Sequence, residues 1–437
     1  MRKAALCLMM SLLLVLTLAT AGAETLTPQY YDPANDMPSW VSEVYDLTDE
    51  ELQALRHGYP SFSLLPLSDG NLLLYGSFEY EDLYMEESHN LGFDEKMPRT
   101  DAYAVAINPN GQRLWHLRIS DPEAQNGFEQ AWLMDDGRIL MKYGNYIGEW
   151  KSQYYIVSQA GEVQEMLPAY KTKVDGTYET LVPMHGGYFG GGQYVTDAYS
   201  PMIREVNLTY YDAELNQRWR IEDKNLIGAS LFSIIPSESG ILLGGSQSYI
   251  EDPDQWTMMP APIALHIDLD GSVIWQYTGH EYAIAAADNL CLAADGGVLF
   301  TSNVDPTVAT PREVVYAAIL TKLDADGQHV WTRDYLEDQG LAYFLDMVPY
   351  QGGFLACGSP DDYQSMAVLH LDQDGEVLDR IDLDLLPCNY LWGALAVSEA
   401  GEAYVYGTLA SYDVNENGSS ENYSSTVFFV PVKGGES

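Results

Sequence analysis

The segment Asp413–Glu421 (DVNENGSSE) has the residue types and spacing of a calcium-binding loop. Oxygen-bearing side chains stand at its positions one, three, five and nine, and a glycine at position six suits the sharp turn of such loops. Ser424 stands where an EF-hand has its bidentate glutamate, so any site should be weak. The alternative is an unliganded loop rich in Asn, Ser and Gly. The expected calcium ligands are Asp413, Asn415, Asn417 and Glu421.

Aromatic and acidic side chains gather in two other long segments, residues 78–101 and 249–262. Aromatic rings stack on the apolar faces of sugars while carboxylates accept hydrogen bonds, so this mixture suits carbohydrate or peptide recognition. The alternative is a solvated loop whose tyrosines pack on the rim. The residues that we expect to contact a ligand are Tyr80, Tyr84, Tyr249 and Trp256.

The sequence does not identify catalytic residues. A glycosidase needs two carboxylates at a fixed separation, and with 64 acidic residues many pairs meet that description. The eight histidines include no close pair suited to a metal, and there is no nucleophile elbow, P-loop or dinucleotide-binding motif. We therefore assign no catalytic residue and expect no cofactor apart from calcium.

One structural unit repeats along the chain. An Asp-Gly pair between alternating apolar residues predicts a hairpin, because glycine accepts the positive φ of a tight, twisted turn. Two such hairpins in series make a four-stranded antiparallel sheet, the blade of a propeller. The glycine at the first turn recurs at intervals of 48 to 67 residues, at Gly70, Gly137, Gly187, Gly240, Gly297, Gly353 and Gly401.

The second hairpin of the unit carries a tryptophan four residues after its turn glycine. The pair is complete at Gly111/Trp115, Gly271/Trp275 and Gly327/Trp331. Trp219 recurs without the glycine, whereas Gly161 and Gly375 recur without the tryptophan. Residues tied to a repeat serve its packing, so we expect these tryptophans to pack blade against blade. The same argument makes the repeated His266, Lys322 and His370 structural.

The pattern of residues 295–331, D-G-G-strand-loop-strand-K-L-D-x-D-G-x-x-x-W, resembles the repeats of secreted bacterial β-propellers and of quinoprotein-like propellers. The resemblance covers roughly Ser61 to Val432 and implies a propeller fold. Quinoprotein dehydrogenases also carry cofactor and calcium ligands on particular blades, and these have no match here. The resemblance therefore implies architecture and no catalytic residue.

Residues Met1–Ala23 have the features of a cleaved signal peptide, with two basic residues, an apolar core and a small-residue cleavage site; an uncleaved anchor is the alternative. Cleavage takes the 21 Lys and Arg residues to 19 against 64 acids, a net charge of −45. Phosphate binding needs a positive surface, so nucleic acid is excluded as a partner. We expect a secreted protein whose acidity serves solubility or a cationic partner, and whose Cys291 and Cys357 are buried on strands.

Two terminal segments match as partners. Ser39–Tyr45 (SWVSEVY) resembles the fourth strand of a blade, whereas the last repeat ends with Thr426–Val432 and leaves too few residues for its own fourth strand. We expect these segments to pair and close the ring. Between the N-terminal segment and the first repeat, Thr48–Arg56 has a capping box and predicts one short helix.

The sequence thus predicts an all-β protein, a single seven-bladed propeller over residues 61–433 with six or eight blades as alternatives. It follows a signal peptide (1–23) and a closing strand and helix (24–60), and precedes a short tail (434–437). Because the connections after the second and fourth strands are long, any site is expected on their face. We predict a binding module without catalysis, for an unidentified carbohydrate, peptide or protein; the alternative is a secreted carbohydrate-active enzyme, a glycoside hydrolase or lyase.

Overall fold

The computed structural model describes residues 24–44, 48–57, 59–84, 98–121, 124–146, 150–167, 180–195, 204–222, 229–252, 257–279, 287–302, 317–360, 365–414 and 420–432. The fold is mostly β, with 65% strand and 6% helix, which confirms the all-β class. No helix in the described ranges is long and apolar enough to cross a membrane.

The strands form antiparallel meanders in which each strand pairs with the next along the chain. The first two meanders are β3 (Tyr59–Pro66), β4 (Leu72–Tyr84), β5 (Pro98–Ile107) and β6 (Arg113–Ile119), and then β7 (Gln125–Leu133), β8 (Ile139–Tyr146), β9 (Trp150–Val157) and β10 (Val163–Met166). A single parallel pair, Thr100 with Gln125, joins these two meanders into one eight-stranded sheet.

Three further four-stranded sheets follow in the chain. The first contains β11 (Thr180–Met184), β12 (Gly187–Val195), β13 (Arg204–Tyr211) and β14 (Gln217–Glu222). The second contains β15 (Ala229–Ser237), β16 (Gly240–Asp252), β17 (Thr257–Asp268) and β18 (Val273–Thr278). The third contains β19 (Leu290–Leu292), β20 (Val298–Ser302), β21 (Ile319–Leu323) and β22 (His329–Asp334).

N-terminal strands complete the last two sheets. One contains β23 (Tyr343–Tyr350), β24 (Gly353–Ser359), β25 (Met366–Leu371) and β26 (Val377–Leu383), with β1 (Glu24–Leu26) added in parallel beside β26. The other contains β27 (Tyr390–Val397), β28 (Ala403–Val414) and β29 (Ser420–Val432), with β2 (Gln29–Tyr31) antiparallel beside β29.

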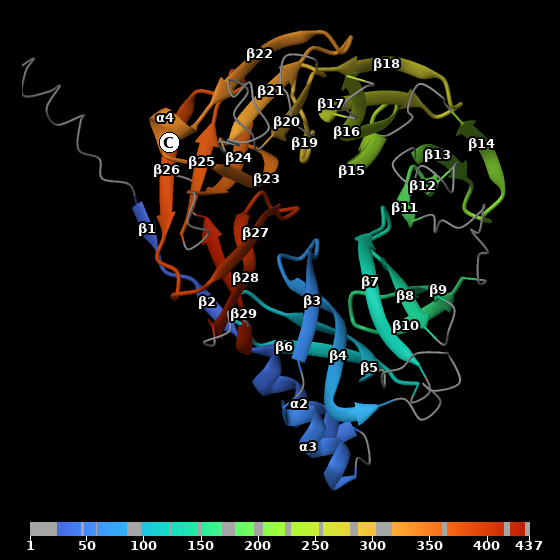
Figure 1. Ribbon diagram of the computed structural model, residues 1–437, viewed down its shortest axis with the longest axis vertical. Helices are drawn as coiled ribbons and strands as arrows, with labels where there is room; N and C mark the ends of the chain where they lie inside the picture. The colour runs from blue at the N-terminus through green and yellow to red at the C-terminus, as the bar shows by residue number, and fades with distance from the viewer. Residues whose placement is uncertain are drawn as a thin grey trace, which may run out of the picture.

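The sheets lie side by side around a common centre, with the first strand of each meander innermost (Figure 1). This arrangement is consistent with a propeller. Because successive strands run in opposite directions, the turns after first and third strands share one face, here called the short-turn face. The connections after second and fourth strands share the other, the long-loop face.

Three turns on the short-turn face, 268–271, 324–327 and 372–375, have the geometry that their Asp-x-x-Gly sequences require. In the β21–β22 turn the Gly327 N–H donates to the Asp324 carbonyl at 3.0 Å. The Asp324 carboxylate accepts from the backbone N–H groups of Asp326 and Gln328 at 3.0 and 2.8 Å. Gly327 adopts φ +76°, which a side chain would disfavour. These hairpins confirm the predicted second turn of the repeat.

The repeated tryptophans join neighbouring meanders, as predicted. Trp275 on β18 donates its indole N–H to the Ala325 carbonyl at 3.1 Å, in the β21–β22 turn of the next meander. Its ring lies over that turn's glycine, since a β-carbon added at Gly327 would be 2.6 Å from the ring. The other pairs of this type are Trp115 with Gly161, Trp219 with Gly271 and Trp331 with Gly375.

The N-terminal closure differs from the expectation in its residues. An N-terminal strand does pair with β29, but it is β2, where Tyr30 faces Phe428. The expected strand Ser39–Tyr45 is wrong, because its residues through Val44 belong to helix α2 (Pro33–Val44). Met37, Trp40 and Val41 of α2 are buried at helical spacing, and Trp40 stacks on His116 of β6 with ring centres 4.1 Å apart.

Further helices are present beside α2. Helix α3 (Asp49–His57) agrees with the predicted helix, and its capping box forms: Thr48 Oγ1 accepts from the Glu51 N–H at 3.1 Å while Glu51 accepts from the Thr48 N–H at 3.0 Å. The expectation of one short helix was therefore wrong, since α2 and the four-residue α4 (Leu336–Gln339) are also helical.

The core lies between adjacent sheets, where both faces of the strands are apolar. Cys291 on β19 and Cys357 on β24 are buried free thiols, as expected, and burial raises the pKa of both. The repeated position of His266, Lys322 and His370 is structural: His266 bonds to Ser237 Oγ at 3.0 Å, and Lys322 bonds to Asp295 at 2.6 Å.

Candidate functional site

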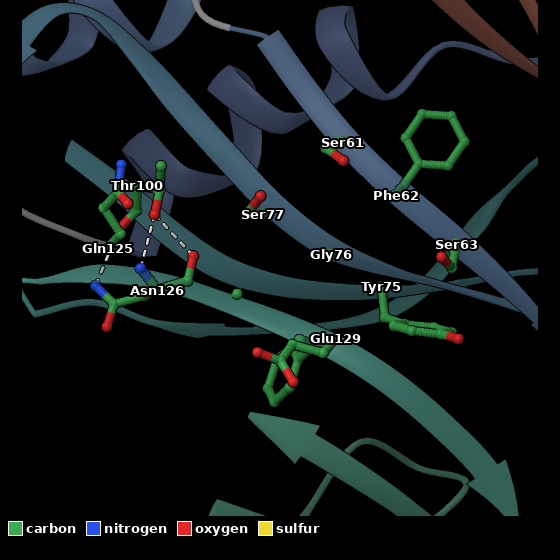
Figure 2. A pocket seen from close by; sticks show the side chains of 12 residues that line it. Ser61, Phe62, Ser63, Tyr75, Gly76, Ser77, Thr100, Gln125, Asn126 and Glu129 are labelled. Atoms are coloured by element: carbon green, nitrogen blue, oxygen red, sulfur yellow. Dashed lines mark hydrogen bonds between the residues drawn. The ribbon is translucent and has the colours of Figure 1, made fainter. Parts of the chain in front are cut away.

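A cavity of about 320 Å³ lies between the β3–β6 and β7–β10 meanders (Figure 2). Strands β3, β4, β5 and β7 supply its walls. The lining residues are Ser61, Phe62, Ser63, Tyr75, Gly76, Ser77, Thr100, Gln125, Asn126, Gly127, Phe128 and Glu129. They come from the first halves of β3, β5 and β7 and the middle of β4, so the cavity is displaced toward the long-loop face.

Small residues keep the cavity open. Ser61, Ser77 and Gly127 stand where larger side chains would fill the space between the two meanders. A β-carbon at Gly127 would be 3.3 Å from the Ser77 β-carbon, so even alanine would crowd this wall. In Figure 2 the serine side chains of β3 and β4 line one wall of the cavity, opposite β7.

A buried polar network fixes the wall formed by β5 and β7. Thr100 Oγ1 donates to the Asn126 carbonyl at 2.9 Å and accepts from the Asn126 N–H at 2.6 Å. The Asn126 side chain donates to the Thr100 carbonyl at 2.9 Å and accepts from the Tyr143 hydroxyl at 2.5 Å. Asn145 donates to the same Asn126 oxygen at 3.1 Å. Satisfied buried networks are rigid, so this wall is preorganised.

One carboxylate reaches the cavity. Glu129 occupies a bulge of β7, where the register shifts between Phe128 and Gln130. Its carboxylate bonds to the Lys142 ammonium at 2.8 Å, and the Lys142 side chain is only 8% exposed. A buried ammonium requires such a partner. The Glu129 charge is thus already neutralised within the protein.

Tyr75 is a buried ring in the wall of the cavity. Its hydroxyl accepts hydrogen bonds from the Ala131 backbone N–H and the Ser63 side chain, but burial dominates and raises the pKa of Tyr75. The phenol is therefore neutral at physiological pH and can donate a hydrogen bond. Together with Phe62 and Phe128 it gives the cavity an aromatic lining beside the hydroxyl groups.

The lining offers hydrogen-bonding groups and aromatic rings rather than a pair of carboxylates. Glycosidases use two carboxyl groups about 5–10 Å apart, and Glu129 is the single carboxylate among these twelve residues. The serine hydroxyls have no imidazole beside them in the lining, so no activated nucleophile is assembled there. What the residues offer is a set of neutral donors and acceptors around aromatic rings.

The four aromatic residues expected to contact a ligand are not brought together in this cavity. Tyr80 on β4 is 1% exposed, so its ring does not lie on an open loop. Tyr84 ends β4 opposite Pro98, and Tyr249 lies in β16 opposite Met259. Trp256 lies outside the described residues. A ligand-binding role for these residues stays a prediction, and the burial of Tyr80 argues against it there.

Tyr80 belongs instead to an ionic network at the edge of the β3–β6 meander. Its hydroxyl donates to Asp101 at 2.5 Å, and Arg118 bonds both the Tyr80 hydroxyl and the Asp101 carboxylate. Burial and the Asp101 charge raise the pKa of Tyr80. Arg99 continues the network to Glu51 of α3 at 3.0 Å. The charges are balanced within the network, which fastens α3 to the meander.

The backbone of the expected calcium loop is described only at its two ends. Asp413 on β28 faces Glu421 on β29 as a strand partner. Asn415 and Asn417 lie outside the described residues. Among the side chains that the structure describes, no group of three His, Cys, Asp or Glu residues is placed to hold a metal ion. Calcium binding by this loop stays a prediction.

Sequence reasoning did not find the cavity residues. Serine and glycine on strands are ordinary in a repeat protein, and the bulge at Glu129 has no sequence mark of its own. The available signal was local: Gly127 lies inside a strand, and glycine inside a strand often marks a close approach or a bulge.

No protein-family model matches the chain, and no curated protein sequence matches it. Solved structures align with it at low identity. The Pan2 WD40 domain of Neurospora crassa is 8% identical over 84% of this chain and 87% of its own, with a TM-score of 0.42. The α-L-arabinofuranosidase Arb93A of Fusarium graminearum is 9% identical over 94% of this chain and 98% of its own, with a TM-score of 0.43.

Lignostilbene dioxygenase of Pseudomonas brassicacearum is also similar, at 9% identity over 84% of this chain and 88% of its own, with a TM-score of 0.43. These neighbours have propeller-type folds and include both binding domains and enzymes. At such TM-scores they carry no argument about activity or ligand.

Proposed function

We propose that this protein is an exported binding module that holds a neutral carbohydrate in the cavity between the β3–β6 and β7–β10 meanders. The observation that carries the proposal is the cavity lining: hydroxyl and amide groups beside aromatic rings, with the single carboxylate of Glu129 paired to Lys142. Neutral polyols are recognised by such donors and acceptors together with ring stacking.

The proposed architecture is a single seven-bladed propeller. It is supported by the series of meanders β3–β6, β7–β10, β11–β14, β15–β18, β19–β22, β23–β26 and β27–β29, the last completed by β2. An experimental density map with six or eight blades would overturn it. The proposed export rests on the leader-like residues 1–23, and a mature N-terminus at Glu24 in secreted protein would test that.

Glycan-array screening followed by calorimetry tests the binding proposal. Ser61 is an exposed strand residue on the cavity wall, so Ser61→Trp should block the cavity without disturbing the core and abolish sugar binding. Ser424→Trp is the matched control, because Ser424 is an exposed strand residue of β29 that does not line the cavity. Binding unaffected by Ser61→Trp would place the ligand elsewhere.

We expect that sugars incubated with the protein are recovered chemically unchanged. Glu129→Gln should leave the protein able to bind while it weakens the Lys142 contact and lowers the melting temperature. Release of a shortened glycan by the wild type, lost in Glu129→Gln, would reject the binding module in favour of a glycoside hydrolase. Chain cleavage that leaves an unsaturated sugar would indicate a lyase.

A further inference from the structure

The tryptophan–glycine pair joins four pairs of neighbouring meanders, and it is missing between the β7–β10 and β11–β14 meanders. On β10, Glu165 pairs with Ile156 and so occupies the strand position that Trp115, Trp275 and Trp331 hold on their own strands. In the facing β13–β14 turn, Leu215 stands in place of glycine and adopts φ +61°. Both members of the pair are therefore replaced at the same junction.

The two replacements are sterically linked. At the other junctions a β-carbon on the turn glycine would come within 2.6 to 2.9 Å of the indole ring, so tryptophan and a side chain at the turn exclude each other. Leu215 has such a side chain, and it packs against the apolar cluster that contains Leu167 and Tyr188. With glutamate opposite it, the repeated position supplies no indole ring to this junction.

A cavity of about 250 Å³ lies at this junction, on the short-turn face. Glu165 lines it, and so does Ala213. Ala213 stands two residues before Leu215, as Gln159, Leu269 and Ala325 stand two before their glycines, and the carbonyls of those three residues accept the indole N–H. The cavity thus lies beside the turn that an indole ring contacts at the junctions with the tryptophan–glycine pair.

The lining of this cavity combines an apolar floor with an acidic rim. Apolar side chains include Met134, Leu167, Met184 and the ring of Tyr188. The rim carries Asp135, Asp136 and Glu165 against one cation, Arg138, which is paired with Asp136 at 2.7 Å. Since Arg138 balances Asp136, the charges of Asp135 and Glu165 leave the rim negative. The chain as a whole also has a net charge of −43. An anionic ligand is therefore excluded by repulsion.

We propose that this junction cavity binds an aromatic ring that carries a protonated amine, with the ring on the apolar floor and the ammonium at Glu165 and Asp135. The floor would provide the packing surface for the ring, and the rim would select a cation. This site is separate from the proposed carbohydrate cavity, which lies toward the opposite face. The same chemistry is found in a free arylalkylamine and in a peptide with a tryptophan beside its amino terminus.

Calorimetric titration with tryptamine and with indole-3-propionate separates ring from charge, because the two probes share the indole and carry opposite charges. We expect tryptamine to bind at least about tenfold more tightly. Glu165→Gln should reduce that preference, whereas Glu162→Gln, an exposed acid on the same outer segment outside the cavity, should not. Equal binding of the two probes, or no binding of either, would overturn the proposal.

A combined substitution tests the location. Glu165→Trp with Leu215→Gly rebuilds the tryptophan–glycine pair and should fill the cavity, so that tryptamine binding is lost while the melting temperature rises or stays the same. Retained binding in this well-folded variant would place the site elsewhere. Comparing the affinities of tryptamine and of the peptide Trp-Gly-Gly distinguishes the two sources of the ligand. Tighter binding of the peptide indicates that the ligand is a chain terminus, and tighter binding of tryptamine indicates that it is a small molecule.

Discussion

The indole ring of Trp275 lies against Gly327 of the neighbouring meander, with its N–H bonded to the Ala325 carbonyl two residues earlier in the same turn. The glycine serves two purposes at once, since it gives the turn its positive φ and leaves room for the ring. The hairpin of one meander is thereby also the packing surface for the previous one. Repeats joined this way depend on their neighbours for stability.

Gly327→Ala should destabilise the protein by about 2–4 kcal/mol, because the new β-carbon would be 2.6 Å from the Trp275 ring and the residue would keep φ +76°. Gly401→Ala is the control, since Gly401 has φ +79° but nothing within 4 Å of the added carbon. It should cost only about 1 kcal/mol. Urea unfolding of both variants measures the difference, and equal losses would show that the tryptophan contact contributes nothing.

Much of this frame follows from local sequence, because a glycine turn and a tryptophan four residues later determine both hairpin and junction. The position of the closing strand could not be predicted from local sequence. Gln29–Tyr31 is three residues long, too short for a periodic pattern. Ser39–Tyr45 alternates well enough to resemble a strand, yet the spacing of Met37, Trp40 and Val41 fits a helix that packs on β6.

The candidate cavity was beyond sequence reasoning for another reason. It depends on the space left between Ser61, Ser77 and Gly127, which belong to different strands of two meanders. Each is unremarkable alone, and only the relative position of the sheets makes them a wall. The middle of each segment that attracted attention by composition lies outside the described residues.

The two N-terminal strands, β1 and β2, should contribute unequally to closing the ring of sheets. Removing residues 24–31 deletes β2, exposes the edge of β29 and removes the Tyr30 carbonyl that lies 3.1 Å from a β-carbon built at Gly111. We expect a loss on the order of 3 kcal/mol or more, with aggregation through the open edge. Removing residues 24–27 deletes only β1 and should cost much less. Equal melting temperatures for the two truncations would refute β2 as the closing strand.

Calcium binding at residues 413–421 remains a proposal that thermal unfolding can test. Asp413 and Glu421 are strand partners on β28 and β29, so the two residues lie at the base of the same loop. Calcium at 10 mM should stabilise the protein by about 1–3 kcal/mol if the affinity is about 10⁻⁴–10⁻³ M. Asp413→Ala should abolish the effect, whereas Asp374→Ala, an exposed acid in another turn, should not. No stabilisation of the wild type would leave the loop without a metal.

Stability should also fall between about pH 4 and pH 6 because of Asp346 on β23. Asp346 as a whole is half-buried, but its carboxyl group is desolvated, and this burial raises the pKa of Asp346 to about 6. The Met347 and Leu395 N–H groups each donate a hydrogen bond to the carboxyl group at 2.8 Å, which lowers the pKa but does not offset the burial. The folded protein then holds a proton that the unfolded chain has released. The stabilisation is complete below the unfolded pKa near 4 and is lost as pH rises through 6.

The loss amounts to at most about 3 kcal/mol for this group, at about 1.4 kcal/mol for each unit of pKa. Asp346→Asn should be less stable than the wild type at pH 4, since an amide nitrogen cannot accept the hydrogen bond of a backbone N–H, and it should lose less stability between pH 4 and 6. A residual slope is expected, because burial also raises the pKa of Asp288 to about 6. Urea unfolding at pH 4, 5, 6 and 7 measures this, with Asp374→Asn as an exposed control; identical slopes for the wild type and Asp346→Asn would show that the Asp346 carboxyl group is ionised throughout.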